Sequence, residues 1–222
     1  MAINLGLDTI RPAVVTIDVH RGHLDPTCAT LPLEAGAAAA VVAANKRFLD
    51  AARAAGIPIV HVVTYYREAA EIASNPFWRA IADTGVTRSN IMRHNLDGMP
   101  GTQLIPELYE PAYDRVVRTK KRYNCFLATD LDFVLRNTLG VNTLLITGVN
   151  TNSCVLTTTI AAQTMDYAAI VISDCVDTCD GPDFHAKALS IIERAFGWVM
   201  TGDQALRLVA GESMLQHATA RE

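Results

Sequence analysis

The stretch that decides the fold is "TLLITGVNTNSCVLTTTIAAQ", residues 143–163. It begins with an apolar run that predicts a buried strand, and Gly148 ends that run. Four small polar residues and Cys154 follow, and then a stretch typical of a helix. A strand that passes directly into a helix is characteristic of α/β proteins, and here the passage from one to the other carries a thiol.

The same alternation continues along the chain. It favours a Rossmann-like three-layer α/β/α fold with a central, mostly parallel sheet of about six strands. The length of 222 residues predicts a single domain, residues 1–222. Residues 66–113 are irregular and rich in Pro and Gly, and so long a segment is expected to line or cover a site. Strands are predicted over 13–18, 57–65, 114–119, 141–148, 168–174 and 197–201, and helices over 33–56, 129–140, 152–167 and 181–196.

Composition excludes several classes of function. The net charge of −4 gives no basic footprint for nucleic acid or an anionic membrane surface. No apolar run reaches the roughly 18 residues of a membrane span, and the N-terminal residues lack the pattern of a signal peptide, so a cytoplasmic protein is expected. Charged residues make up only 19% of the chain, which favours self-association.

Three kinds of polar group, an acid, an amine and a thiol, collect at the edge of the predicted sheet where α/β proteins bind ligands, the carboxyl ends of the strands. The first strand ends at Asp18, the third runs into Lys120 and Lys121, and Cys154 follows the fourth. Each also fits an ordinary role, as a turn acid, a surface amine or a core thiol. Together they indicate a nucleophile, because a helix N-terminus and a nearby ammonium lower a thiol pKa.

The loop after Asp18 offers further candidates. His20 and His23 fit a polar loop or a pocket wall equally well, and Arg21 is suited to grip a substrate carboxylate or ureide carbonyl. His20, His23 and Asp25 are possible metal ligands by type, but their spacing is not specific. The remaining cysteines are read as packing residues in a reducing compartment: Cys28, Cys125, Cys175 and Cys179.

Taken together, three motifs resemble the isochorismatase-like cysteine hydrolases. They are "VVTID" (14–18), "KKRYNCFLATDLDFVLR" (120–136) and "TGVNTNSCV" (147–155), the last similar to the family's Gly-Val-x-Thr-x-x-Cys-Val. The resemblance spans about Pro12 to Thr201. It implies a family of amidohydrolases that act on small amides and ureides, such as N-carbamoylsarcosine, ureidoacrylate and biuret.

What the resemblance implies can be carried onto single residues. Asp18, Lys120 and Cys154 would form the catalytic triad, with Lys120 preferred over Lys121 because the family's lysine stands two residues before the Arg-Tyr pair. The peptide bond Val149–Asn150 would be cis, and the backbone N–H groups of Asn150 and Cys154 would form the oxyanion hole. A homodimer or homotetramer is implied as well. Residues expected to bind substrate are His20, Arg21, Tyr123, Asn124 and Phe126, with Phe77 and Trp78 as possible caps.

Departures from the family pattern narrow the range of activities expected of this chain. The Asp-x-His metal set that nicotinamidases carry after the second strand is missing from "HVVTYYRE" (61–68), so neither a metal nor any other cofactor is expected. Family members that cleave an enol ether lack the cysteine, so Cys154 favours amide chemistry. We therefore expect attack by the Cys154 thiol on a small amide or ureide, with Asp18 moving the proton, Lys120 lowering the thiol pKa, and water cleaving the thioester.

Two other classes remain open at this point. A nucleotide- or flavin-binding module on such a sheet needs a glycine-rich turn after the first strand, and "DVHRGHLDP" (18–26) has one glycine. A non-catalytic member of the same family, acting as a small-molecule-binding or scaffold protein, would keep the fold without turnover.

Overall fold

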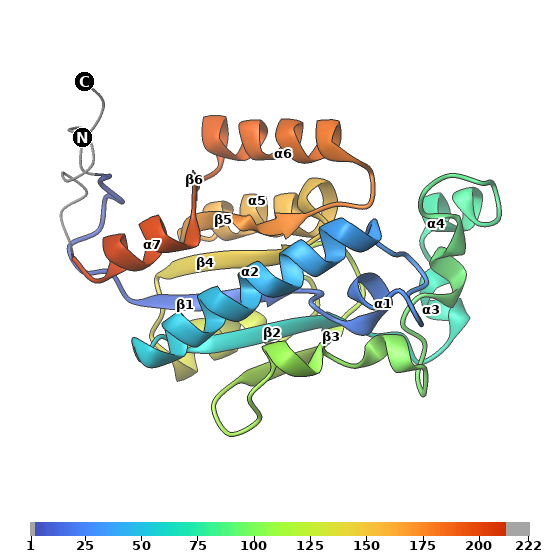
Figure 1. Cartoon of the computed structure of the whole chain (residues 1–222), viewed down its shortest axis with the longest axis horizontal. Helices are drawn as coiled ribbons and strands as arrows, with labels where there is room; N and C mark the ends of the chain where they lie inside the picture. The colour runs from blue at the N-terminus through green and yellow to red at the C-terminus, as the bar shows by residue number, and fades with distance from the viewer. Residues whose placement is uncertain (1–2, 212–222) are drawn as a thin grey trace.

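The computed structural model describes residues 3–211. The limits of the predicted domain, residues 1 and 222, lie outside this range. The chain builds one six-stranded sheet in the order β3-β2-β1-β4-β5-β6, and every neighbouring pair is parallel (Figure 1). The predicted fold class is confirmed. The strands are β1 (Pro12–Ile17), β2 (Ile59–Thr64), β3 (Arg115–Lys120), β4 (Thr143–Val149), β5 (Ala168–Asp177) and β6 (Trp198–Met200).

Helices cover both faces of the sheet. The α-helices are α1 (Arg21–Leu24), α2 (Ala35–Ala54), α3 (Ala69–Ala73), α4 (Pro76–Ile81), α5 (Leu156–Thr164), α6 (Pro182–Ala195) and α7 (Gly202–Val209). Three 3-10 helices are η1 (Ser89–Arg93), η2 (Pro100–Thr102) and η3 (Pro106–Leu108), and two π-helical segments are η4 (Phe133–Thr138) and η5 (Thr151–Val155). No helix within residues 3–211 is long and apolar enough to cross a membrane.

Two buried clusters show how the strands hold these layers. Along β1, Val14 belongs to the cluster with α2 and α7, whereas Val15 belongs to the cluster with η4, α5 and α6. Successive side chains of a strand point to opposite faces, so each strand supplies both clusters and reads as a continuous apolar run. The sequence analysis missed α7. This helix is amphipathic, and Thr201 with Gln204 forms a capping box at its start.

Gly148 fixes how β4 approaches β1. Its φ is 103°, and a Cβ atom there would lie 2.0 Å from the carbonyl oxygen of Ile17. Only glycine meets both conditions. The chain therefore leaves β4 close beside the end of β1, which brings the residues after both strands to the same place.

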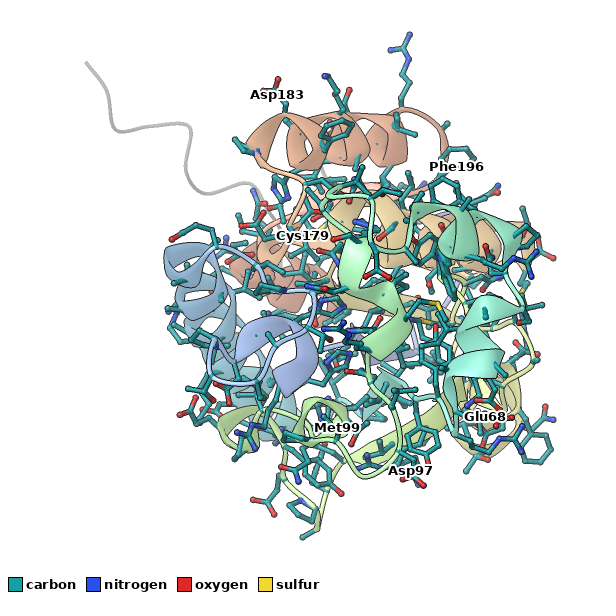
Figure 2. The ribbon with its side chains drawn as sticks, turned by 90° about the vertical axis from the view of Figure 1, so that its right-hand side faces the viewer. Glu68, Asp97, Met99, Cys179, Asp183 and Phe196 are labelled. Carbon is teal, nitrogen blue, oxygen red and sulfur yellow. The ribbon has the colours of Figure 1, made fainter. Side chains whose placement is uncertain are left out.

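The irregular segment 66–113 folds over the carboxyl ends of the strands. Its α3, α4 and η1 lie beyond the carboxyl ends of the strands (Figure 1). Figure 2 views the molecule from that end, and the labels Glu68, Asp97 and Met99 mark the segment. A small cluster of its own, which includes Tyr66, Ile72, Trp78 and Ile91, holds the segment together.

Candidate active site

Asp18 stands directly after β1 and is completely buried. Its φ of 53° is unusual for a residue with a side chain, and such conformations cluster at functional sites. One carboxylate oxygen, Oδ1, accepts a hydrogen bond of 2.8 Å from the Thr64 N–H, and the other, Oδ2, lies 2.6 Å from the ammonium of Lys120. The end of β2 and the end of β3 thus hold this carboxylate in one orientation.

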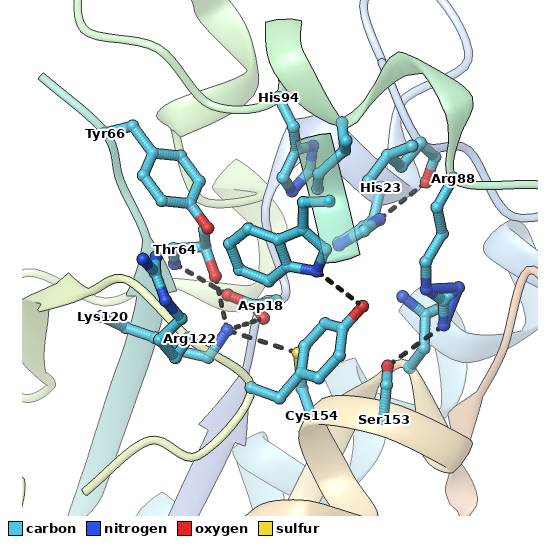
Figure 3. Close-up of a pocket in the computed structure, with 15 residues that line it drawn as sticks. Asp18, His23, Thr64, Tyr66, Arg88, His94, Lys120, Arg122, Ser153 and Cys154 are labelled. Atoms are coloured by element: carbon cyan, nitrogen blue, oxygen red, sulfur yellow. Dashed lines mark hydrogen bonds and ion pairs between the residues drawn. The ribbon is translucent and has the colours of Figure 1, made fainter. Parts of the chain in front are cut away.

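Lys120 is the last residue of β3 and is 1% exposed. Its Nζ donates to Asp18 and Thr64 and lies 3.3 Å from the Cys154 sulfur (Figure 3). Lys121 follows the strand and does not line the pocket that borders Cys154. It pairs with Glu71 at 2.9 Å, so Lys120 is the lysine that meets both the carboxylate and the thiol.

Cys154 lies in η5, where the chain from β4 turns into α5, and is 5% exposed. The peptide bond Val149–Asn150 is cis. Local departures from regular α-helix such as this π-helical segment are frequent at functional sites. The end of β1, the end of β3 and the start of the helical segment after β4 therefore bring an acid, an amine and a thiol together.

Burial and charge set the protonation states of these three groups. Burial raises the pKa of Asp18, but the Lys120 charge and the hydrogen bond with His20 together hold that pKa well below its usual value. Burial lowers the pKa of Lys120. Asp18 and Cys154 together raise that pKa by more, so the amine stays charged. Burial raises the pKa of the Cys154 thiol to about 11, although Lys120 acts in the opposite direction. The sequence predicted a low thiol pKa from the nearby cation, but the depth of burial, which raises the pKa, cannot be read from the sequence.

A pocket borders Asp18, Lys120 and Cys154, and the irregular segment lines its other side. Trp78, Arg88, Ile91 and His94 of that segment line it together with Asp18, Lys120 and Cys154. Its cavity volume is about 30 Å³, which is room for about two water molecules. The indole N–H of Trp78 donates to the Tyr123 hydroxyl at 3.2 Å and ties the cover to the residues after β3.

The residues predicted to bind substrate separate into two groups. Tyr123 lines the pocket, whereas His20 lies outside the lining but is buried with Nε2 3.5 Å from the Asp18 carboxylate. Arg21, Asn124 and Phe126 lie outside the pocket lining. Arg21 instead pairs with Asp25 at 2.7 Å, the Asn124 side chain accepts from the Phe126 N–H, and the Phe126 ring stacks on Tyr167.

Sequence reasoning missed Arg88 and His94 as pocket residues. The Arg88 guanidinium donates to Ser153, beside the cysteine, at 3.2 Å and pairs with Asp180 at 2.7 Å. Both residues come from a segment without periodic pattern, so no signal in the sequence marks them. Of the two proposed caps, Trp78 is buried, whereas Phe77 is 62% exposed.

His20, His23 and His94 form a cluster of buried rings beside the triad. Two of them, His23 and His94, belong to the pocket lining (Figure 3). Asp25, which the sequence offered as a third ligand beside His20 and His23, is engaged by Arg21 and Thr27 instead.

Comparison with known proteins identifies the family. A family model described as an isochorismatase domain matches residues 12–204. The chain therefore belongs to the isochorismatase family, as its motifs predicted.

Several relatives match most of the length of this chain. Ureidoacrylate amidohydrolase RutB of Serratia proteamaculans (strain 568) is 35% identical over 211 residues, with 89% of this chain and 82% of that protein covered. A cysteine hydrolase from Pseudomonas syringae pv. phaseolicola 1448A superposes with a TM-score of 0.78 at 25% identity, covering 95% and 96% of the two chains. N-carbamoylsarcosine amidase from Thermoplasma acidophilum gives a TM-score of 0.69 at 26% identity, covering 87% and 98%.

Proposed function

We propose that this chain is a cysteine amidohydrolase that cleaves a C–N bond of a small amide or ureide. The observation that carries the proposal is the position of the Lys120 ammonium, 2.6 Å from the Asp18 carboxylate and 3.3 Å from the Cys154 sulfur, at the floor of one pocket. The names of the relatives, ureidoacrylate amidohydrolase and N-carbamoylsarcosine amidase, support the same reaction class.

The reaction proceeds through a covalent intermediate. Cys154 Sγ attacks the substrate carbonyl carbon, and Asp18 takes the thiol proton and passes it to the leaving nitrogen as the C–N bond breaks. Ammonia or an amine departs and leaves a thioester on Cys154. Water then attacks the same carbon, and the thiol is regenerated as the acid product leaves.

The thiol pKa of about 11 sets the order of these events. The resting thiol is protonated, so its proton leaves as the sulfur attacks rather than beforehand. Lys120 keeps its charge throughout and stabilises the thiolate character that develops. The oxyanion is assigned to the backbone N–H groups of Asn150 and Cys154, and each such donor contributes about 10²–10³-fold in rate.

Arg88 is proposed to recognise the part of the substrate away from the scissile bond. It is a cation in the pocket lining, and its guanidinium can bind a carboxylate or ureide oxygen with two donors. Tyr123 is assigned to the remaining wall. Because the cavity holds only about two water molecules, the cover that carries Trp78 and Arg88 must move when a substrate enters.

An ammonia-release screen over small amides and ureides tests the function. It should include ureidoacrylate, N-carbamoyl amino acids, biuret, maleamate and nicotinamide. Under the proposal at least one compound turns over, and mass spectrometry of the quenched protein finds the acyl adduct on Cys154. If compounds bind but none is hydrolysed, the alternative holds, a non-catalytic small-molecule-binding or scaffold member of the family.

The assembly is proposed to be a homodimer or homotetramer. The low charged fraction of the chain supports this, as do large apolar side chains left exposed at Phe77, Phe133 and Phe184. Light scattering at micromolar concentration should return a multiple of the 24.0 kDa chain mass. A mass equal to one chain would refute it.

A further inference from the structure

Three histidines lie together beside Asp18, and the proposed reaction gives their cluster no role. Each of His20, His23 and His94 offers one ring nitrogen, and these nitrogen atoms all lie within 4.8 Å of one another. Their residues are 0%, 4% and 3% exposed. The rings come from the residue before α1, from α1 itself and from the residue after η1, so the fold rather than a local motif assembles them.

Each ring is held through its other nitrogen. His23 Nδ1 lies 2.6 Å from the Leu31 carbonyl oxygen, which can only accept, so Nδ1 carries the proton and Nε2 keeps a lone pair. His94 Nδ1 lies 2.9 Å from the Thr30 hydroxyl, and this bond likewise leaves Nε2 available. Outer partners of this kind orient metal-binding histidines and fix their tautomers.

His20 supplies an independent observation. Its Nε2 lies 2.8 Å from the Asn95 side-chain amide, and its Nδ1 is buried without any hydrogen-bond partner among residues 3–211. Asn95 Oδ1 is buried without a partner as well. Buried polar atoms in this condition are rare, and each calls for an explanation. A cation on His20 Nδ1 supplies the first missing partner. The ring proton then sits on Nε2, where the Asp18 carboxylate oxygen 3.5 Å away accepts it, and the Asn95 amide moves off Nε2 while it keeps its 2.8 Å bond to the Thr64 carbonyl oxygen.

We propose that His20, His23 and His94 bind one divalent transition-metal ion, with an open coordination position facing the pocket. Three imidazoles with a free fourth position are a ligand set that zinc uses in catalytic sites, and imidazole also suits cobalt, nickel and iron. The Asp18 carboxylate, 3.5 Å from His20, favours a cation here, and Lys120 opposes it.

The position of the ion gives it a defined part. Because His23 and His94 line the same pocket as Cys154, the open position takes up water or an oxygen of the bound substrate. The site differs from the Asp-x-His set whose absence led the sequence analysis to expect no metal. The proposal does not depend on the proposed hydrolase function, because binding is measured without turnover.

Metal titration of the chelator-treated full chain tests the site. Co²⁺ should bind one ion per chain and produce visible d–d absorption, and Zn²⁺ should displace it. His23→Ala and His94→Ala should each weaken Co²⁺ binding at least about 100-fold, and Thr30→Val, which removes only the outer partner of His94, about 10–100-fold. His185→Ala is the matched control. That ring bonds to Thr151 outside the cluster, and its loss should leave binding unchanged.

A Cys154→Ala variant separates the histidine site from a metal held by the thiol. Under the proposal the variant keeps the d–d absorption, and the wild-type protein lacks a thiolate-to-cobalt charge-transfer band. Failure of Co²⁺ and Zn²⁺ to bind at micromolar concentration overturns the site. So does binding that survives in the two histidine variants but disappears in Cys154→Ala. Thr30→Val keeps the test valid if a histidine variant fails to fold.

Discussion

Two buried carboxylates of this protein lie at opposite edges of the sheet, beside two strands that β2 separates. Asp18 follows β1 at the carboxyl edge of the sheet, whereas Asp114 precedes β3 at the amino edge. Asp114 pairs with Arg53 at 2.7 Å and with His61 at 3.0 Å, and it also accepts from the Glu110 N–H. Both acids are buried, paired with cations and shifted to low pKa.

The difference between them lies in what surrounds the pair. Asp18 and its lysine border a pocket that contains a thiol, whereas Asp114 does not line that pocket and has no nucleophile among its partners. A depressed pKa in a buried acid is therefore not by itself a mark of a functional site. The carboxyl edge of a parallel sheet, together with a reactive partner and a cavity, is what distinguishes Asp18.

The largest effect is expected at the nucleophile. Cys154→Ser should lower kcat by at least about 10³-fold, because the hydroxyl is a far weaker nucleophile in a site without a matched base. Circular dichroism and the melting temperature should stay close to wild type, since the side chains are nearly equal in size. Turnover within tenfold of wild type would remove Cys154 from this role. The other buried thiol on this side of the sheet, Cys125, provides the control Cys125→Ser.

The second comparison sets Lys120 against Lys121. Lys120→Ala should lower the rate about 10²–10⁴-fold and slow iodoacetamide labelling of Cys154 at pH 8, since loss of the cation raises the thiol pKa further. Lys120→Arg should restore part of the rate, because a planar guanidinium fits a compact ammonium site poorly. Lys121→Ala should change little, as its partner is Glu71. A loss confined to Lys121→Ala would reverse the assignment.

The third test concerns Asp114 and predicts the opposite behaviour. Asp114→Asn should lower the free energy of unfolding at pH 7 by about 2–3 kcal/mol and leave turnover of the folded protein unchanged. Burial raises the pKa of Asp114, but bonds from His61 and Arg53 hold it at about 2, below the unfolded value of about 3.9.

The sign of the pH dependence follows from that shift. The stability that Asp114 contributes is present above pH 4 and is lost as the pH falls through about 2. Urea unfolding of wild type and Asp114→Asn between pH 2 and pH 7 should therefore converge at the acid end. A variant with wild-type stability and impaired turnover would undo the contrast between the two acids.

The smallest effects separate two arginines. Arg88→Ala should raise KM about tenfold for a substrate with a carboxylate, because a charge-assisted bond in the pocket is lost. Arg21→Ala should leave KM unchanged, since its half-exposed pair with Asp25 lies outside the pocket lining. Steady-state kinetics on carboxylate-bearing and neutral substrates checks both. An increase in KM for Arg21→Ala alone would restore the candidate that the sequence favoured.

The sequence predicted the sheet well because buried parallel strands are continuous apolar runs. The strand from residue 141 to 148 corresponds to β4, and the helix after it to η5 and α5. The segment 66–113 resisted prediction, since its short helices have no period and are held by tertiary packing around Trp78 and Tyr66. For the same reason the cover residues Arg88 and His94 could not be assigned to the pocket.

The sequence by itself determined the fold class, the family and the candidate active-site residues Asp18, Lys120 and Cys154. Strand order and the carboxyl-edge rule are encoded in local patterns of apolar residues, so these can be read directly. Only the tertiary structure decided the thiol pKa, the shape of the pocket and the position of His94 beside His20 and His23. Burial and the meeting of His94 with residues some 70 positions away depend on how distant segments pack, which no local pattern records.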